Sequence, residues 1–264
     1  YNTDTRIRRA AFKDGDTMYG IGVFLRRGAC GALAVCLSAF PLVLGTGAAV
    51  PAVSASSAAL YCPATGEFAF TQNADVRRGM ASTTKIMTAL VAIEQGDPAA
   101  EIVIPPEAVG VEGSSLYLKA GEKMTLRDLL YGLLLQSAND AAEAIAVAVG
   151  GSVEGFADLM NAKAAQMGLT DTHFTNPHGL ADENHYTTAR ELSEIAAEAM
   201  RQPLFREICG SRRAAIPNGE GGKRYLVNHN RLLFTYAGAV GVKTGFTKAT
   251  GRCLVSAAQR DGVE

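Results

Sequence analysis

The hydrophobic and polar positions of the chain predict short strands at both ends of its folded part, with helices between them. Apolar residues recur at helical spacing in five Ala- and Leu-rich segments: 85–95, 126–136, 140–149, 153–167 and 188–200. Four β-prone runs around polar turns predict two hairpins, 58–62 with 67–72 and 239–246 with 253–257. This order predicts an α+β fold, and we expect the terminal strands to share one antiparallel sheet.

The segment before these elements has a different character. Residues 28–50 contain no charged side chain, follow the pair Arg26-Arg27 and run into the small residues 53–55. This pattern is typical of a secretory signal peptide and predicts a leader over residues 1–55, followed by one exported domain over 56–264. Residues 1–17 are interpreted as an over-extended start, because Met18 lies at a suitable distance before the arginine pair. The alternative is an uncleaved leader that contacts the membrane as an anchor.

Charge and composition exclude several classes of protein. The 264 residues include 25 basic and 26 acidic side chains and are 48% hydrophobic, which excludes a disordered chain and gives no reason to expect a nucleic-acid partner. The net charge of −1 combines a basic leader with an acidic domain. Beyond residue 55, the three cysteines Cys62, Cys209 and Cys253 lack metal-ligand spacing and are predicted to be small buried hydrophobes. Neither a metal nor a cofactor is predicted.

The first candidate for chemistry is Ser82-Thr-Thr-Lys85, at the start of a predicted helix. Two residues three positions apart lie on one face of a helix, so the Ser82 hydroxyl and the Lys85 amine can meet. A neutral amine can take the proton of a serine and make it a nucleophile. The alternative is that Ser82 only caps the helix and Lys85 is solvated.

The second candidate is Ser137-Ala-Asn139, between two predicted helices. On one continuous helix these two side chains would point about 200° apart, so they can face one pocket only if the helix is interrupted. Ser and Asn favour helix ends, which makes a short break there reasonable. Ordinary capping of the second helix is the alternative.

The third candidate is Lys243-Thr244-Gly245 on a predicted strand. The absence of a Cβ at Gly245 allows a ligand backbone to lie close beside the strand, as in peptide recognition by strand addition. Lys243 is expected to supply a fixed positive charge, which also lowers the pKa of Lys85, and Thr244 a hydroxyl for a carboxylate. The alternative is an edge strand protected by a lysine.

Each pattern alone is weak, but their combination and order resemble the penicillin-binding proteins and serine β-lactamases. The longer surrounding sequences resemble more narrowly the low-molecular-mass D-alanyl-D-alanine carboxypeptidases of bacterial cell-wall metabolism. They are NADVRRGMASTTKIMTAL, LLLQSANDAAEAIA, TNPHGLADENHYTTARELSEIA and GVKTGFTKATGRCLVSAA. The resemblance covers about residues 57–262. Members of this family continue beyond the last hairpin, so we expect this chain to be C-terminally truncated, lacking the last strand and helix of the fold.

The resemblance implies a role for each candidate residue. Ser82 would attack the peptide bond between the terminal D-alanines of a peptidoglycan pentapeptide, with Lys85 as proton acceptor and Ser137 as the relay to the leaving group. The substrate would be bound by Asn139, Lys243, Thr244 and Gly245. Backbone N–H groups of Ser82 and Phe246 would form the oxyanion hole. β-Lactam antibiotics would acylate Ser82 as inhibitors.

Two other function classes remain at this point. A serine β-lactamase shares the three motifs, but the class A enzymes add a Glu for deacylation, and no E-x-x-L-N pattern occurs between Ser137 and Lys243. A non-hydrolytic penicillin-recognising or peptidoglycan-binding protein would need the same acylation groups. His178 is predicted to belong to a turn rather than to a catalytic triad, because Asn-Pro and His-Gly are turn dipeptides.

Overall fold

The computed structural model describes residues 52–260, and those from Ala55 onward belong to one compact unit. The predicted leader lies outside the described residues, except for its small-residue end. Along the described part of the chain, none of the helices combines the length and the apolar composition that crossing a membrane requires.

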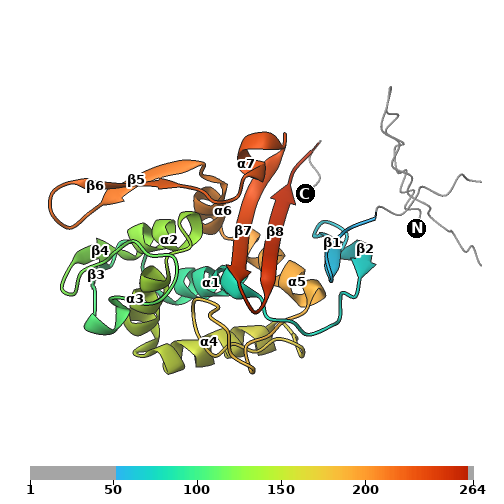
Figure 1. Ribbon diagram of the computed structural model, residues 1–264, viewed down its shortest axis with the longest axis horizontal. Coiled ribbons are helices and arrows are strands. Elements are labelled where there is room, and N and C mark those ends of the chain that lie inside the picture. The colour runs from blue at the N-terminus through green and yellow to red at the C-terminus, as the bar shows by residue number, and fades with distance from the viewer. Residues whose placement is uncertain (1–51, 261–264) are drawn as a thin grey trace, which may run out of the picture. The chain divides into compact units, whose positions relative to one another are not determined.

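Helix α1 (Lys85–Gln95) passes through the centre of the unit, as Figure 1 shows. Every residue from Lys85 to Ala92 is buried, because α2, α3, α4, α5 and α6 all contact this helix. A helix that is apolar on all sides is stable only inside a core. The 3₁₀ turn η1 (Ala81–Thr84) leads directly into α1 and is therefore held on a rigid base.

The five predicted helices are confirmed, with every end within one residue of its predicted position. The remaining helices of this region are α2 (Leu126–Leu135), α3 (Asn139–Gly150), α4 (Val153–Gln166), α5 (Ala189–Arg201), α6 (Pro203–Gly210) and α7 (Leu232–Thr235). Three begin with a side chain that accepts a hydrogen bond from the backbone N–H three residues on: Thr125, Ser152 and Thr188. The sequence interpretation missed α6, whose Pro203 stands at a position where helices favour proline.

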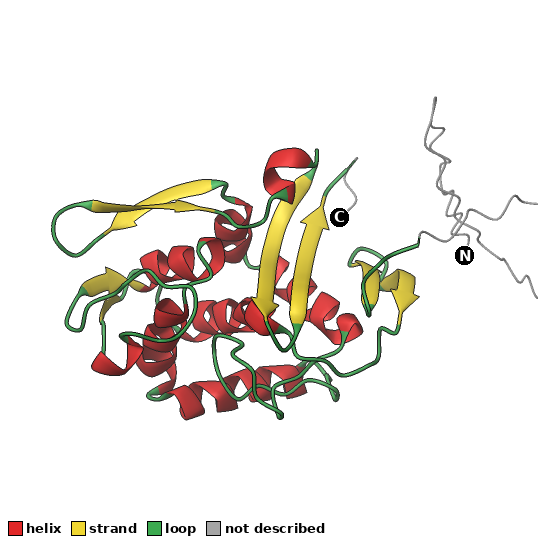
Figure 2. Cartoon of the chain, viewed as in Figure 1, coloured by secondary structure: helices red, strands yellow, loops and turns green. Residues whose placement is uncertain are grey.

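Within residues 52–260 the strands form four separate two-stranded antiparallel sheets, visible in Figure 2. They are β1 (Ala58–Cys62) with β2 (Glu67–Gln72), β3 (Glu101–Val103) with β4 (Lys123–Thr125), β5 (Arg213–Pro217) with β6 (Lys223–Val227), and β7 (Ala239–Thr247) with β8 (Gly251–Ala258). The first and last match the two predicted hairpins. The other two were missed, since β3 and β4 are only three residues long and β5 and β6 follow a helix without an apolar run.

The α+β class is confirmed, but the expectation that the terminal strands share one sheet is wrong for the described residues. The β1–β2 hairpin and the β7–β8 hairpin are separate two-stranded sheets. They pack mainly on different supports, because β1 contacts α5 whereas β7 contacts η1 and α6, and α5 reaches the second hairpin only through β8. Alternation along a strand predicts which face is buried, but it does not specify which strands pair along an edge.

Packing also places a loop beside η1 and α3. A Cβ on Gly132 of α2 would lie 2.3 Å from Leu116 Cδ1, so this glycine makes room for the leucine. Leu116 is buried against α2 and fixes the loop of residues 113–118. The loop therefore rests on the hydrophobic core rather than standing free in solvent.

Candidate active site

The Ser82 hydroxyl and the Lys85 amine meet at the junction of η1 and α1. Side chains three residues apart eclipse each other in a 3₁₀ turn, and Lys85 Nζ lies 3.1 Å from Ser82 Oγ. Neither η1 nor α1 has a side chain as its N-terminal cap. The predicted contact is confirmed, and the capping alternative for Ser82 is not supported.

Lys85 is fully buried and has two further hydrogen-bond partners. Its Nζ donates to Asn139 Oδ1 and to the carbonyl oxygen of His178, both at 2.7 Å. Desolvation, followed by the charge of Lys243, holds the pKa of Lys85 well below its usual range, against the opposing effect of Asp140. The neutral, basic form of this amine is therefore accessible.

The predicted interruption between the second and third helices is confirmed. Helix α2 ends at Leu135, Ser137 has a left-handed backbone with φ of 61°, and α3 begins at Asn139. Ser137 consequently faces Lys243, while Asn139 faces Lys85. Because of this break, Ser137 contacts Lys243 and Asn139 contacts Lys85.

The second lysine, Lys243, lies on β7 and is 1% exposed, so it is not a protective lysine on an edge strand. Its Nζ donates to Ser137 Oγ at 3.0 Å and to the carbonyl oxygen of Thr244 at 2.9 Å. Burial lowers the pKa of Lys243 to about 7. The positive charge expected here therefore depends on pH near neutrality.

The end of β7 lies against η1. A Cβ on Gly245 would stand 2.9 Å from the backbone nitrogen of Ser82, so this glycine makes room for η1, whereas the ligand backbone predicted beside the strand stays a prediction. Thr244 is half-buried on β7, and Phe246 is 63% exposed. A pocket of about 120 Å³ opens here, lined by Ser82, Gly113, Ser114, Asn139, His178, Gly179, Leu180, Phe246 and Thr247.

The sequence interpretation missed the 113–118 loop and its anchor, Asp140. The buried Asp140 carboxylate accepts hydrogen bonds from Ser115 Oγ at 2.6 Å and from the backbone N–H groups of Leu116 at 3.0 Å and Leu118 at 3.1 Å. Gly113 and Ser114, just before these residues, line the pocket. The only sequence signal was an acidic residue placed directly after Asn139.

Two histidines support η1 and the pocket from the segment of residues 175–188. His178 lies in a turn, as predicted, and contributes its backbone carbonyl to Lys85. His185 is 3% exposed, and its Nε2 lies 2.7 Å from Thr84 Oγ1, while its Nδ1 accepts from the N–H of Thr175 at 3.1 Å. Burial is the largest cause that lowers the pKa of His185 to about 4.

Asn228 and Asn230 together connect β7 to α6. Asn228 Nδ2 donates to the carbonyl of Cys209 at 3.0 Å, and Asn230 Nδ2 donates to the carbonyl of Gly241 at 2.8 Å. Cys209 is buried as predicted. The other two cysteines beyond residue 55 are only partly buried, which corrects the expectation for them.

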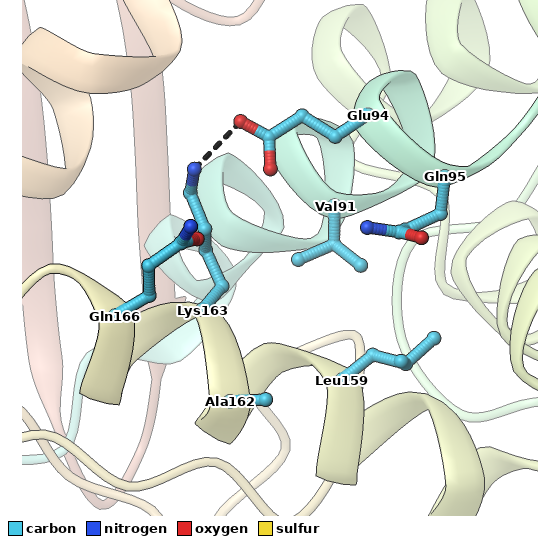
Figure 3. A pocket seen from close by; sticks show the side chains of 7 residues that line it. All are labelled: Val91, Glu94, Gln95, Leu159, Ala162, Lys163 and Gln166. Carbon is cyan, nitrogen blue, oxygen red and sulfur yellow. Dashed lines mark hydrogen bonds and ion pairs between the residues drawn. The ribbon is translucent and has the colours of Figure 1, made fainter.

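A second hollow of about 250 Å³ lies between α1 and α4 (Figure 3). Val91 and Leu159 supply apolar walls, and Lys163 forms an ion pair with Glu94 at 2.7 Å across its rim. It contains none of the candidate residues. In the part of the chain that the structure describes, no group of three or more His, Cys, Asp or Glu side chains is placed to hold a metal ion.

Comparison with known proteins points to one family. The family model described as D-alanyl-D-alanine carboxypeptidase matches residues 45–264. The D-alanyl-D-alanine carboxypeptidase DacF of Bacillus subtilis is 36% identical over 78% of this chain, and the D-alanyl-D-alanine carboxypeptidase of a Streptomyces species is 34% identical over 97%. The chain spans 54% of the Bacillus protein and 89% of the Streptomyces protein.

Solved structures agree with this assignment. The crystal structure of a Streptomyces DD-transpeptidase superimposes with a TM-score of 0.76 at 36% identity, covering 81% of this chain and 88% of that one. A penicillin-binding protein homologue from Mycobacterium tuberculosis gives a TM-score of 0.79 at 34% identity, covering 83% of both chains. With most of the chain matched in sequence and in fold, the protein belongs to the D-alanyl-D-alanine carboxypeptidase family.

Proposed function

We propose that this protein is a serine-type D-Ala-D-Ala carboxypeptidase that removes the terminal D-alanine from peptidoglycan stem peptides through an acyl-enzyme on Ser82. The observation that carries the proposal is the arrangement around Lys85. Its amine contacts one hydroxyl, that of Ser82, and two carbonyl oxygens, those of Asn139 and His178. The substrate class is inferred from family membership, and the reaction type is inferred from the contacts of Ser82 and Lys85.

The two carbonyl oxygens determine where the lone pair of a neutral Lys85 points. Each can only accept, and a neutral amine has two N–H bonds to donate. The side chain of Asn139 is held in this orientation because its Nδ2 donates to the backbone carbonyl of Glu112. Both N–H bonds are therefore engaged, and the lone pair is left to face Ser82 Oγ, as a general base requires.

The reaction then proceeds in two steps. Ser82 Oγ attacks the carbonyl carbon of the penultimate residue while its proton passes to Lys85 Nζ. The backbone N–H groups of Ser82 and Phe246, two residues that line the pocket, are proposed to stabilise the negative oxygen. The C–N bond breaks, a proton delivered through Ser137 completes the amine of the leaving D-alanine, and water hydrolyses the ester on Ser82.

Ser137 and Lys243 are proposed to act together on the leaving side. Lys243 Nζ donates to Ser137 Oγ, so the hydroxyl of Ser137 is free to point its own proton elsewhere. When protonated, Lys243 with the hydroxyl of Thr244 would bind the terminal carboxylate. Asn139 would also hold the substrate amide, and the strand at Gly245 would lie along the substrate backbone.

The proposed substrate and inhibitors also imply a location. Peptidoglycan lies outside the cytoplasmic membrane, so we propose that the protein is exported by the leader at residues 1–55 and acts on the cell-wall side. Sequencing the N-terminus of protein purified from the native host tests this. A start near Ser56 supports cleavage of the leader, whereas a start before Arg26 would support membrane contact through an uncleaved leader.

The activity is tested by incubating the purified full chain with benzylpenicillin and, separately, with a peptide ending in D-Ala-D-Ala. Mass spectrometry follows the tryptic peptide that contains Ser82. A penicilloyl adduct together with released D-alanine supports the proposal. Rapid turnover of penicillin would contradict the proposal and identify a β-lactamase. An adduct without D-alanine release would contradict it and identify a penicillin-recognising protein. The Ser82→Ala variant is the control and is expected to give neither signal.

A further inference from the structure

Glu143 and His178 form a largely buried pair behind the pocket. Glu143 lies on α3, His178 lies in the turn of residues 176–180, and His178 Nε2 is 3.0 Å from Glu143 Oε1. The side chains are 8% exposed for His178 and 13% exposed for Glu143. A carboxylate that is removed this far from water requires a partner, and this ring nitrogen is the partner it has.

The contacts of the imidazole define which nitrogen carries the proton. The N–H of Leu180 donates to His178 Nδ1 at 3.1 Å, so Nδ1 must be an acceptor. The proton of the neutral ring is then on Nε2, where it is donated to Glu143. One tautomer satisfies both contacts, and Glu143 holds the ring in it.

The turn that carries His178 packs closely against η1. Asn176 Oδ1 accepts hydrogen bonds from the N–H groups of His178 at 3.3 Å and Gly179 at 2.7 Å. Gly179 has a φ of 87°, and a Cβ there would lie 1.9 Å from the carbonyl oxygen of Ala81. In this position the turn directs the His178 carbonyl at Lys85 Nζ.

One face of α3 thus reaches Lys85 by two routes. Asn139 and Glu143 are four residues apart, which places them on the same side of the helix. Asn139 binds Lys85 directly, whereas Glu143 binds the ring of the residue whose carbonyl binds Lys85. Helix α3 therefore holds both carbonyl acceptors of the Lys85 amine in place, one directly and one through the contact between Glu143 and His178.

We propose that Glu143 is a positioning residue for Lys85 and acts through His178; this inference rests on the proposed function. Without the carboxylate, His178 Nε2–H has lost its acceptor, the turn is free to shift, and the His178 carbonyl no longer fixes one N–H of the amine. The lone pair of Lys85 is then less well aimed at Ser82 Oγ. Acylation slows, while binding of the substrate before reaction is little affected.

The proposal is tested with Glu143→Leu, which removes the acceptor at similar volume, and Glu143→Gln, which keeps an acceptor oxygen without the charge. The matched control is Glu154→Leu, which removes an exposed carboxylate from α4. Acylation by a fluorescent penicillin and hydrolysis of the D-Ala-D-Ala peptide are measured at a temperature at which circular dichroism shows all variants folded. We expect Glu143→Leu to lower the acylation rate constant and kcat by about 10- to 100-fold with KM within about twofold, and Glu143→Gln to recover most of the loss.

A double-mutant cycle with His178→Phe tests the route. If Glu143 acts through His178, adding Glu143→Leu to His178→Phe causes no further loss of acylation rate. Additive losses would overturn the proposal, as would wild-type acylation by Glu143→Leu or an equal defect in Glu143→Gln. Failure of the proposed function is distinguishable from all of these, because the wild-type protein and the Glu154→Leu control would then also release no D-alanine from the peptide or would turn penicillin over rapidly.

Discussion

A Cβ atom placed on Gly245 would lie 2.9 Å from the backbone nitrogen of Ser82. Two segments more than 160 residues apart in the sequence are therefore in direct contact at the point where the proposed nucleophile is held. The same Cβ would lie 3.1 Å from the backbone nitrogen of Thr83 and 3.2 Å from Ala81 Cβ, so it would meet η1 along its length. This contact sets the distance between β7 and the proposed nucleophile.

The Gly245→Ala variant is expected to push β7 away from η1. The backbone of Gly245 does not require glycine for its φ angle, so the added methyl group acts through this contact alone. We expect a loss of acylation rate of about 10- to 100-fold, because a displacement on the order of 1 Å at a reacting centre has effects of this size. Stopped-flow acylation by a fluorescent penicillin measures it.

The control for this variant is Cys253→Ala. Cys253 pairs with Gly245 across the β7–β8 ladder but does not lie between β7 and η1. It should acylate at nearly the wild-type rate. An equal loss in both variants would mean that the hairpin, not the close approach to Ser82, limits the reaction.

The Lys85→Arg variant is expected to lose acylation by a factor of about 10² to 10⁴, the usual contribution of a general base. Arginine retains the positive charge and the hydrogen-bond donors but does not give up its proton in proteins. The Lys163→Arg variant is a suitable control because Lys163 serves an ion pair with Glu94 on the far side of α1. Retention of wild-type acylation by Lys85→Arg would contradict the assignment of Lys85 as the base.

Binding of a substrate carboxylate is expected to weaken as the pH rises. The pKa of Lys243 in the free protein is about 7 because the side chain is buried, so the protonated form decreases above this pH. KM for a peptide with a free terminal carboxylate should then rise, approaching tenfold per pH unit well above pH 7. Steady-state kinetics between pH 6 and about 9 test this, and a flat KM over that range would exclude Lys243 as the carboxylate-binding cation.

The stability of the fold is expected to fall in mild acid because of His185. Its folded pKa is about 4, while the unfolded chain takes up the proton near 6.5, so the unfolded state binds more protons between these values. Stability therefore decreases as the pH falls from 6.5 towards 4, by about 3 kcal/mol at most for this group. Urea unfolding of wild type and His185→Gln measures it. The wild type should lose more stability in acid than the variant, and parallel curves would contradict the prediction.

Asp140→Ala is expected to destabilise the fold and loosen the pocket. The variant would leave the N–H groups of Leu116 and Leu118 and the hydroxyl of Ser115 without their buried acceptor. Each unsatisfied group costs about 1–3 kcal/mol, so a total loss of roughly 3 kcal/mol or more in the free energy of unfolding is expected. Asp97→Ala, which removes the acceptor of one exposed N–H, should change it by less than about 1 kcal/mol. An equal change in the free energy of unfolding of the two variants would contradict the anchoring role of Asp140.

Local patterns in the sequence were sufficient for the five longest helices, for the first and last hairpins and for the short-range part of the site. The apolar spacing of 85–95 predicted α1 to the residue, and Ser82 and Lys85 meet because three residues of a helical turn bring them together. The interruption between Ser137 and Asn139 was also readable, because both residue types favour helix ends. The catalytic and binding roles given to these residues remain predictions.

Tertiary structure alone decided the contacts between distant segments and the environments of the groups. The pairing of His178 with Glu143, the loop held by Asp140 and the separation of the two terminal hairpins join residues far apart in the chain, and no local periodicity encodes such contacts. The pKa of Lys243 likewise depends on how much water the surrounding elements exclude. The sequence by itself determined which chemical groups are present and on which elements they lie, whereas packing decided which groups meet and which protonation state each can hold.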